Sequence, residues 1–162
     1  MSYCALSELH IVPKGQTITA GYYAEEILKN SLLSAMRRKR KTGNVLSIAM
    51  LPEMSKSIFQ QDGAPAHHAK ISQEWCKSNL KGFWAKGIWP GNSPDLNPIE
   101  NLWSILQTEV DTMAPSTNTE MLIRKVKLAW SQIQPDILDK MYRGMPERIK
   151  KCIKLKGGYI GK

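Results

Sequence analysis

The chain has 162 residues, of which 42% are hydrophobic, and this suits one globular domain better than two independent ones. A net charge of +9 favours an anionic partner. The three cysteines, Cys4, Cys76 and Cys152, are widely spaced, which argues against a disulfide scaffold or a zinc knuckle and favours a reducing, intracellular setting. We expect a soluble, non-secreted protein, because no apolar run reaches the ~20 residues that span a bilayer and no signal pattern opens the chain.

The basic residues gather in two places. Residues 37–41 form an unbroken basic run, and residues 143–162 hold seven more lysines and arginines against the single acid Glu147. Such clusters fit either a solvated helix end or a phosphate-binding surface, and both interpretations stay open. The candidate phosphate-binding residues are Arg37, Arg38, Lys39, Arg40, Lys41, Lys150, Lys151, Lys154 and Lys156.

The first 60 residues predict a strand and then a helix. Alternation over residues 9–12, followed by Pro13-Lys14-Gly15, indicates a strand that ends in a turn. Thr19 is a suitable N-cap for a helix whose apolar residues recur at helical spacing up to the basic run. Residues 44–56 are ambiguous, and no element is predicted there.

Residues 57–85 predict strand, helix and strand. In the strand 57–62, Ile58, Gln60 and Asp62 share one face, and Asp62 lies at the carboxyl end. A helix over 67–79 and a short strand over 83–85 follow. This order is typical of an α/β protein with a mostly parallel sheet, in which ligands gather beyond the carboxyl ends of the strands.

The next segment is punctuated by prolines, so residues 89–97 predict a loop and Pro98 begins a helix behind the N-cap Asn97. Glu100 lies at the border of an apolar stripe formed by Ile99, Leu102, Trp103, Leu106 and Val110. Further helices are predicted over 119–133, after a capping cluster at 117–119, and over 135–156 as one or two helices. The tryptophans are mostly spaced as core residues.

Each acid in this region also has a simpler structural interpretation. Asn97 and Glu100 fit a capping box, Asp62 fits a turn before Gly63, and Asp95 fits a cap or brace of the proline-rich loop. A strand-end acid and a helix-start acid that are separated by 37 residues, enough for one helical excursion, are less well explained as two coincidental turn residues.

The motifs QDGAPAH at 61–67 and SPDLNPIENLW at 93–103 resemble the second and third acidic motifs of Tc/mariner superfamily transposases. The resemblance extends through SELHIVPKG at 7–15 and residues 145–149, and so covers nearly the whole chain. The spacing between the acids is longer than is most common in that superfamily and matches its long-spacing branch.

This resemblance implies a ribonuclease H-like fold, the DDE integrase and transposase fold, in which three carboxylates hold two Mg²⁺ or Mn²⁺ ions. It implies that Asp62 and Glu100 are the second and third catalytic, metal-binding acids. It also implies metal-dependent cleavage and strand transfer on transposon-end and target DNA, a possible homodimer, no membrane partner and a nuclear location. His67 is expected to brace the loop or helix start rather than to bind metal.

In this family the first acid lies on the opening strand of the fold. Its separation from the second acid is larger than the 61 residues that precede Asp62 in this chain. Among the acids before Asp62, none is a credible substitute: Glu8, Glu25, Glu26 and Glu53. We therefore expect residues 1–162 to be a single partial catalytic domain, truncated at its N-terminus, with the acidic motifs in 6–114 and basic helices in 115–162. Alone, it should be inactive and either marginally stable or self-associating. The alternatives are a non-catalytic DNA-binding remnant, a co-opted transposase-derived protein or an inactive pseudogene product.

Overall fold

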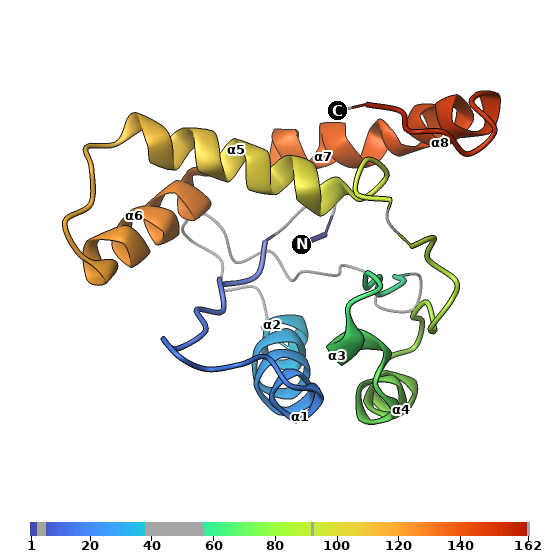
Figure 1. The fold of residues 1–162 in the computed structure, drawn as a ribbon, viewed down its shortest axis with the longest axis horizontal. Helices are drawn as coiled ribbons and strands as arrows, with labels where there is room; N and C mark the ends of the chain where they lie inside the picture. Colours follow the sequence, from blue (N-terminus) through green and yellow to red (C-terminus); the bar gives the residue numbers. More distant parts are fainter. Residues whose placement is uncertain (3–5, 38–56, 92, 162) are drawn as a thin grey trace. The chain divides into compact units, whose positions relative to one another are not determined.

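A computed structural model describes residues 1–2, 6–37, 57–91 and 93–161 (Figure 1). Internal contacts group the chain into two compact units, one formed mainly by residues up to 92 and the other by residue 93 onward together with Met1. No helix among the described residues is both long and apolar enough to cross a membrane. The predicted division of one partial domain into residues 6–114, which carry the acidic motifs, and residues 115–162, which form basic helices, stays a prediction.

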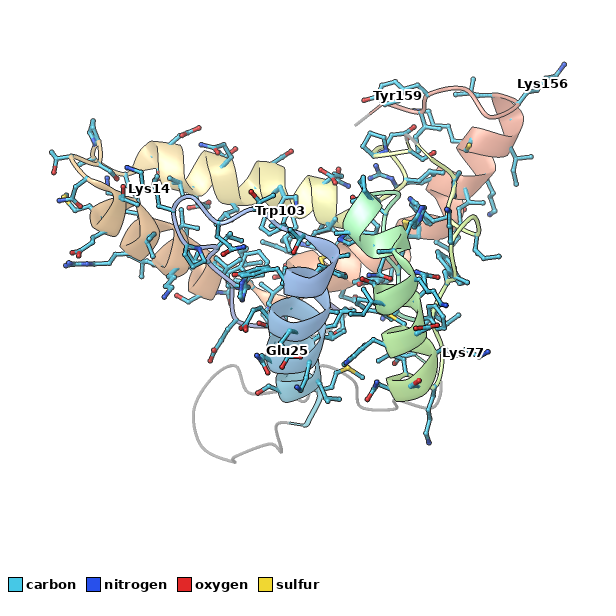
Figure 2. The ribbon with its side chains drawn as sticks, turned by 60° about the horizontal axis from the view of Figure 1, so that its bottom comes forward. Lys14, Glu25, Lys77, Trp103, Lys156 and Tyr159 are labelled. Atoms are coloured by element: carbon cyan, nitrogen blue, oxygen red, sulfur yellow. The ribbon has the colours of Figure 1, made fainter. Side chains whose placement is uncertain are left out.

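The first unit opens with one continuous helical stretch in three parts, which are α1 (Ala20–Tyr22), the π-helix η1 (Tyr23–Leu32) and α2 (Leu33–Arg37). Thr19 caps it as predicted, since its hydroxyl accepts the Tyr22 N–H at 3.2 Å. The wide turns of η1 bring the Ser31 hydroxyl to 2.9 Å from the Glu26 carbonyl, five residues back. Leu28 is fully buried, and the exposed acid Glu25 lies on this helix (Figure 2).

The predicted helix over 67–79 is instead two helices, α3 (Pro65–His68) and α4 (Lys70–Asn79). Ala69 between them is extended, and two side chains of α4 satisfy carbonyls of α3. The Ser72 hydroxyl donates to the Ala66 oxygen at 2.6 Å, and the Gln73 amide donates to the His67 oxygen at 2.9 Å. The break is therefore stabilised, and it makes α3 a separate turn directly after Asp62.

The predicted strands are much shorter than expected. Phe59 and Phe83 form a parallel bridge, and no strand is assigned at 9–12. The Phe59 N–H donates to Gly82 O and the Trp84 N–H to Phe59 O, both at 3.0 Å. Gly82 suits this close approach, because a Cβ there would lie 3.1 Å from the Ser57 oxygen. The parallel direction agrees with the predicted sheet.

The second unit consists of four helices within the described residues, α5 (Pro98–Thr112), α6 (Thr119–Gln132), α7 (Pro135–Arg143) and α8 (Met145–Lys154). Helix α5 packs against α6 and α7. Leu102 and Ala129 are fully buried, whereas Trp103, predicted as core, is 42% exposed and stacks on the buried Trp130 with ring centroids 5.5 Å apart. Asn118 caps α6, accepting the Met121 N–H at 2.9 Å.

Candidate functional site

Asp62 follows the bridge residues of the first unit and closes a tight turn. Its Oδ1 accepts the Ala64 N–H at 2.9 Å, two residues on, as turn-forming aspartates do. The same oxygen lies 2.6 Å from Nδ1 of His67 in α3. Asp62 is thus a turn former, as its simpler interpretation predicted. Because both hydrogen bonds end on Oδ1 and the side chain is 52% exposed, a ligand role for the carboxylate remains compatible with the turn.

His67 is held from its other side by the buried core of the same unit. The ring of Tyr23 lies against the imidazole, with centroids 4.4 Å apart. The Tyr23 hydroxyl accepts a hydrogen bond of 2.6 Å from the buried Gln61 amide. Burial raises the pKa of Tyr23 well above its usual range. The ring is therefore a neutral, fixed platform for His67.

Cys76 completes this core. Its thiol lies 3.8 Å from the Gln61 carbonyl oxygen, and burial raises its pKa to about 11. The thiol is therefore a packed, protonated group at neutral pH rather than a nucleophile or a metal ligand. The network running from Cys76 through Gln61 and Tyr23 ends at the pair of His67 and Asp62.

Glu100 lies in the first turn of α5 in the second unit, where the N-terminal end of a helix favours negative charge. The Glu100 N–H donates to Asn97 O at 3.1 Å, but the Asn97 side chain makes no capping hydrogen bond to the helix. The Asn97 half of the predicted capping box is therefore not formed. Glu100 is partly buried, as its border position predicted.

An open groove of about 540 Å³ runs beside Glu100. Two of its walls are exposed aromatic side chains, Trp103 on α5 and Tyr159 after α8, both labelled in Figure 2. The remaining lining is polar apart from one proline, and consists of Pro94, Asp95, Asn101, Ser104 and Gln107. Glu100 is therefore accessible to a ligand that enters this groove.

Asp95 braces the loop that leads to Glu100. Its buried carboxylate accepts the Ile160 N–H at 2.9 Å through Oδ2. Its main-chain oxygen accepts from the Arg148 guanidinium, at 3.0 Å from Nε and also from Nη2. The interpretation of Asp95 as a loop brace is thus confirmed, and its partners lie on α8 and the segment after it.

The predicted phosphate-binding residues differ in their surroundings. Lys150 pairs with Glu147 at 2.7 Å, and the Lys151 ammonium donates to Ile160 O at 2.5 Å, so both have structural partners. Lys154 and Lys156 are exposed. Arg38, Lys39, Arg40 and Lys41 lie outside the described residues, and Arg37 ends α2.

Asp62 and Glu100 are hard oxygen donors, which is the ligand chemistry that Mg²⁺ and Mn²⁺ prefer. Among the described residues, no cluster of three or more histidines, cysteines and acids occurs that could hold a metal ion by itself. The structure therefore supplies two suitable carboxylates, one in each unit, rather than a complete ligand set.

Comparison with known proteins identifies the family. A family model of DDE superfamily endonucleases matches residues 12–123. The transposase of the transposable element Tcb2 from Caenorhabditis briggsae is 33% identical over 100 residues, which are 62% of this chain and 35% of that protein. The Tc3 transposase from Caenorhabditis elegans is 34% identical over 103 residues, or 63% of this chain and 30% of that protein. The chain spans about a third of the length of these curated relatives.

Solved structures show the same fold. The catalytic domain of Mos1 mariner transposase superposes with a TM-score of 0.71 at 17% identity, covering 94% of this chain and 69% of that one. The same domain with Raltegravir and Mn gives 0.69 at 20% identity, covering 94% and 70%. The Mos1 paired-end complex with the left transposon end gives 0.75 at 20% identity, covering 98% and 42%.

The chain belongs to the DDE superfamily endonuclease family and is a catalytic-domain region of the Tc/mariner transposase superfamily. The predicted ribonuclease H-like fold and the predicted family are both confirmed.

Sequence reasoning missed the residues that support the acids. Periodicity predicts only packing for Tyr23, which is one of the regularly spaced apolar residues in the helix after Thr19, and it predicts no role for Gln61, Arg148 or Tyr159. A signal for Gln61 was present, because it faces away from Asp62 on a strand and a polar side chain that points into a core needs a partner.

Proposed function

We propose that this chain provides the second and third carboxylates, Asp62 and Glu100, of a DDE catalytic centre that cleaves and joins DNA in cut-and-paste transposition. The observation that carries the proposal is the family membership, together with the place of the two acids within the matched motifs. Both side chains are accessible. His67 braces the turn that bears Asp62, and Arg148 braces the loop that precedes Glu100.

Asp62 and Glu100 would act as oxygen ligands for Mg²⁺ or Mn²⁺, and the Mos1 catalytic domain solved with Mn supports this choice of ion. Bound in pairs, such ions activate a water or a 3′-hydroxyl for attack on phosphorus and stabilise the leaving oxygen. The chain's own contribution is to fix the two carboxylates, one at the turn before α3 and one at the start of α5.

DNA is the proposed partner, as transposon ends and as target. The net charge of +9 and the exposed Lys154 and Lys156 support phosphate contacts, and the Mos1 paired-end complex supports a dimer on two transposon ends. The proposed location is the nucleus, on the grounds of the family membership and the basic cluster at residues 37–41.

A cleavage assay tests the catalytic proposal. Residues 1–162 alone are compared with the same residues fused behind a catalytic-domain segment that carries the first acid of a relative. We expect Mn²⁺-dependent nicking of supercoiled DNA by the fusion and none by residues 1–162, because the latter supply only two of the three ligands. Asp62→Asn and Glu100→Gln should abolish nicking, whereas Glu109→Gln on the exposed face of α5 should not. Nicking by residues 1–162 alone that Asp62→Asn removes would contradict the assignment of a missing ligand.

A salt series tests the DNA-binding alternative, which requires no catalysis. Affinity for duplex DNA should fall steeply as salt rises, and substituting Lys154 and Lys156 by Ala should lower the logarithmic slope by about 1 for each lysine. Lys140→Ala is the matched control, because Lys140 already pairs with Asp136 at 3.0 Å. Absence of binding at low salt would contradict the alternative.

A further inference from the structure

His67 in α3 is hydrogen-bonded to Asp62 in the turn that precedes this helix. Nδ1 of His67 lies 2.6 Å from Oδ1 of Asp62, and the imidazole is only 22% exposed. An ionised carboxylate can only accept, so Nδ1 carries the hydrogen of this bond. Short hydrogen bonds to charged groups are about twice as strong as neutral ones. The contact therefore restrains the rotation of the Asp62 side chain.

His67 is itself held in place by neighbouring residues of the first unit. Tyr23 packs against the imidazole, and Gln61, whose own carbonyl accepts from the Cys76 thiol, fixes the Tyr23 hydroxyl. In addition, the main-chain oxygen of His67 accepts from the Gln73 amide at 2.9 Å. His67 is thus fixed through both its ring and its backbone, and its hydrogen bond in turn restrains the Asp62 side chain.

The two hydrogen bonds to Asp62 leave one of its carboxylate oxygens without a donor from these two groups. Ala64 N–H and His67 Nδ1 both approach Oδ1, so that oxygen is occupied by the protein's own donors. A cation that enters would meet Oδ2 as the better ligand atom. Nδ1 of His67 cannot bind the same cation, because its lone-pair position carries the hydrogen shared with Asp62. The Nδ1 atom of His67 is therefore assigned to the hydrogen bond with Asp62 and not to the cation.

We infer that His67 is a positioning residue that presents Oδ2 of Asp62, as a single ligand oxygen, to the divalent cation. The inference rests on the proposed function, because it assumes that Asp62 is a metal ligand. Groups that orient a metal ligand by hydrogen bonding typically contribute about 10–100-fold to metal affinity. The role requires a hydrogen-bond donor at the place of Nδ1, which the Asn side chain can also offer.

A Mn²⁺ titration of isotope-labelled residues 1–162 tests the inference without an activity assay. The readout is paramagnetic broadening of the Ala64 amide resonance. In the unsubstituted chain the signal should broaden with Mn²⁺, and Asp62→Asn should prevent this. His67→Ala should raise the Mn²⁺ concentration at the midpoint by about tenfold or more. His67→Asn should restore most of the affinity, and His68→Ala, on the same helix, should match the unsubstituted chain.

The outcomes distinguish the ligand role of Asp62 from the positioning role of His67. Equal broadening in the unsubstituted chain and in Asp62→Asn would overturn the ligand role of Asp62, and with it the proposed function. Asp62-dependent broadening with an unchanged midpoint in His67→Ala would overturn only the positioning role. If His67→Ala fails to fold, long-range proton–nitrogen spectra of the unsubstituted chain decide, since a His67 ring without hydrogen on Nδ1 overturns the inference.

Discussion

Arg148 on α8 donates from its guanidinium to the main-chain oxygen of Asp95, five residues before Glu100. The Asp95 carboxylate in turn accepts the Ile160 N–H. The loop that precedes α5 is therefore fixed to the last helix and to the segment that follows it. The start of α5, and the position of Glu100, depend on residues 48 or more positions away in the sequence.

Arg148→Ala should destabilise the second unit by about 1.5–3 kcal/mol, the usual contribution of a hydrogen bond to a charged group. Arg148→Lys should recover only part of this, because an ammonium lacks the planar two-nitrogen geometry. The measurement is urea unfolding followed by Trp fluorescence, with amide hydrogen exchange at Ile160. Arg124→Ala, which removes an exposed pair with Glu120, is the control and should change little. Equal effects of Arg148→Ala and Arg124→Ala would contradict the loop brace.

Leu102→Ala should destabilise the chain by about 2–5 kcal/mol, because Leu102 is fully buried on the face of α5 that meets its neighbouring helices. Leu122→Ala is the matched control, since that side chain on α6 is 45% exposed. Chemical unfolding of both variants measures the difference. A loss in Leu122→Ala as large as that in Leu102→Ala would show that α6 packs through another face.

Alkaline pH should destabilise the first unit. Burial raises the pKa of the Cys76 thiol from its ordinary 9.0 to about 11, so the unfolded chain loses this proton at a lower pH than the folded chain does. The corresponding stability is fully present below pH 9 and is lost as pH rises toward 11. Tyr23 contributes in the same direction above its ordinary pKa of 10.0.

Melting temperatures measured against pH test this dependence. Cys76→Ala should lower stability at every pH but flatten the alkaline decline, whereas Cys152→Ala should leave the decline unchanged. An identical slope in Cys76→Ala and in the unsubstituted chain would show that the thiol does not stay protonated in the folded state.

The helices were predictable because their start signals are local. Pro98 and Pro135 occupy first-turn positions, and Asn118 caps α6 through its own side chain. The strands were less predictable, because a strand exists only through its partner. Among the described residues, Phe59 has the backbone of residues 82–84 beside it and forms a single bridge.

The same contrast between local and distant partners holds around Asp62 and Glu100. A bracing role for His67 was predictable, because its partner Asp62 is five residues away. The support from Tyr23 was not predictable, because the bond between Gln61 and Tyr23 joins residues 38 positions apart, and periodicity carries no information about such pairs. For Glu100, the helix start was predicted from Asn97 and Pro98, but its dependence on Arg148 was not.

Iron-directed cleavage of the polypeptide tests most directly whether Asp62 and Glu100 each act as a ligand for a divalent cation. With hydrogen peroxide as oxidant and ascorbate as reductant, Fe²⁺ bound in place of Mg²⁺ generates hydroxyl radicals that cut the nearby backbone. We predict two groups of cuts in residues 1–162, one around residue 62 and one around residue 100, both suppressed by excess Mg²⁺. Asp62→Asn should weaken the cuts around residue 62, Glu100→Gln should weaken the cuts around residue 100, and Glu109→Gln should weaken neither group. Cuts that are missing near either acid, or that persist when that acid is substituted, would contradict its role as a metal ligand.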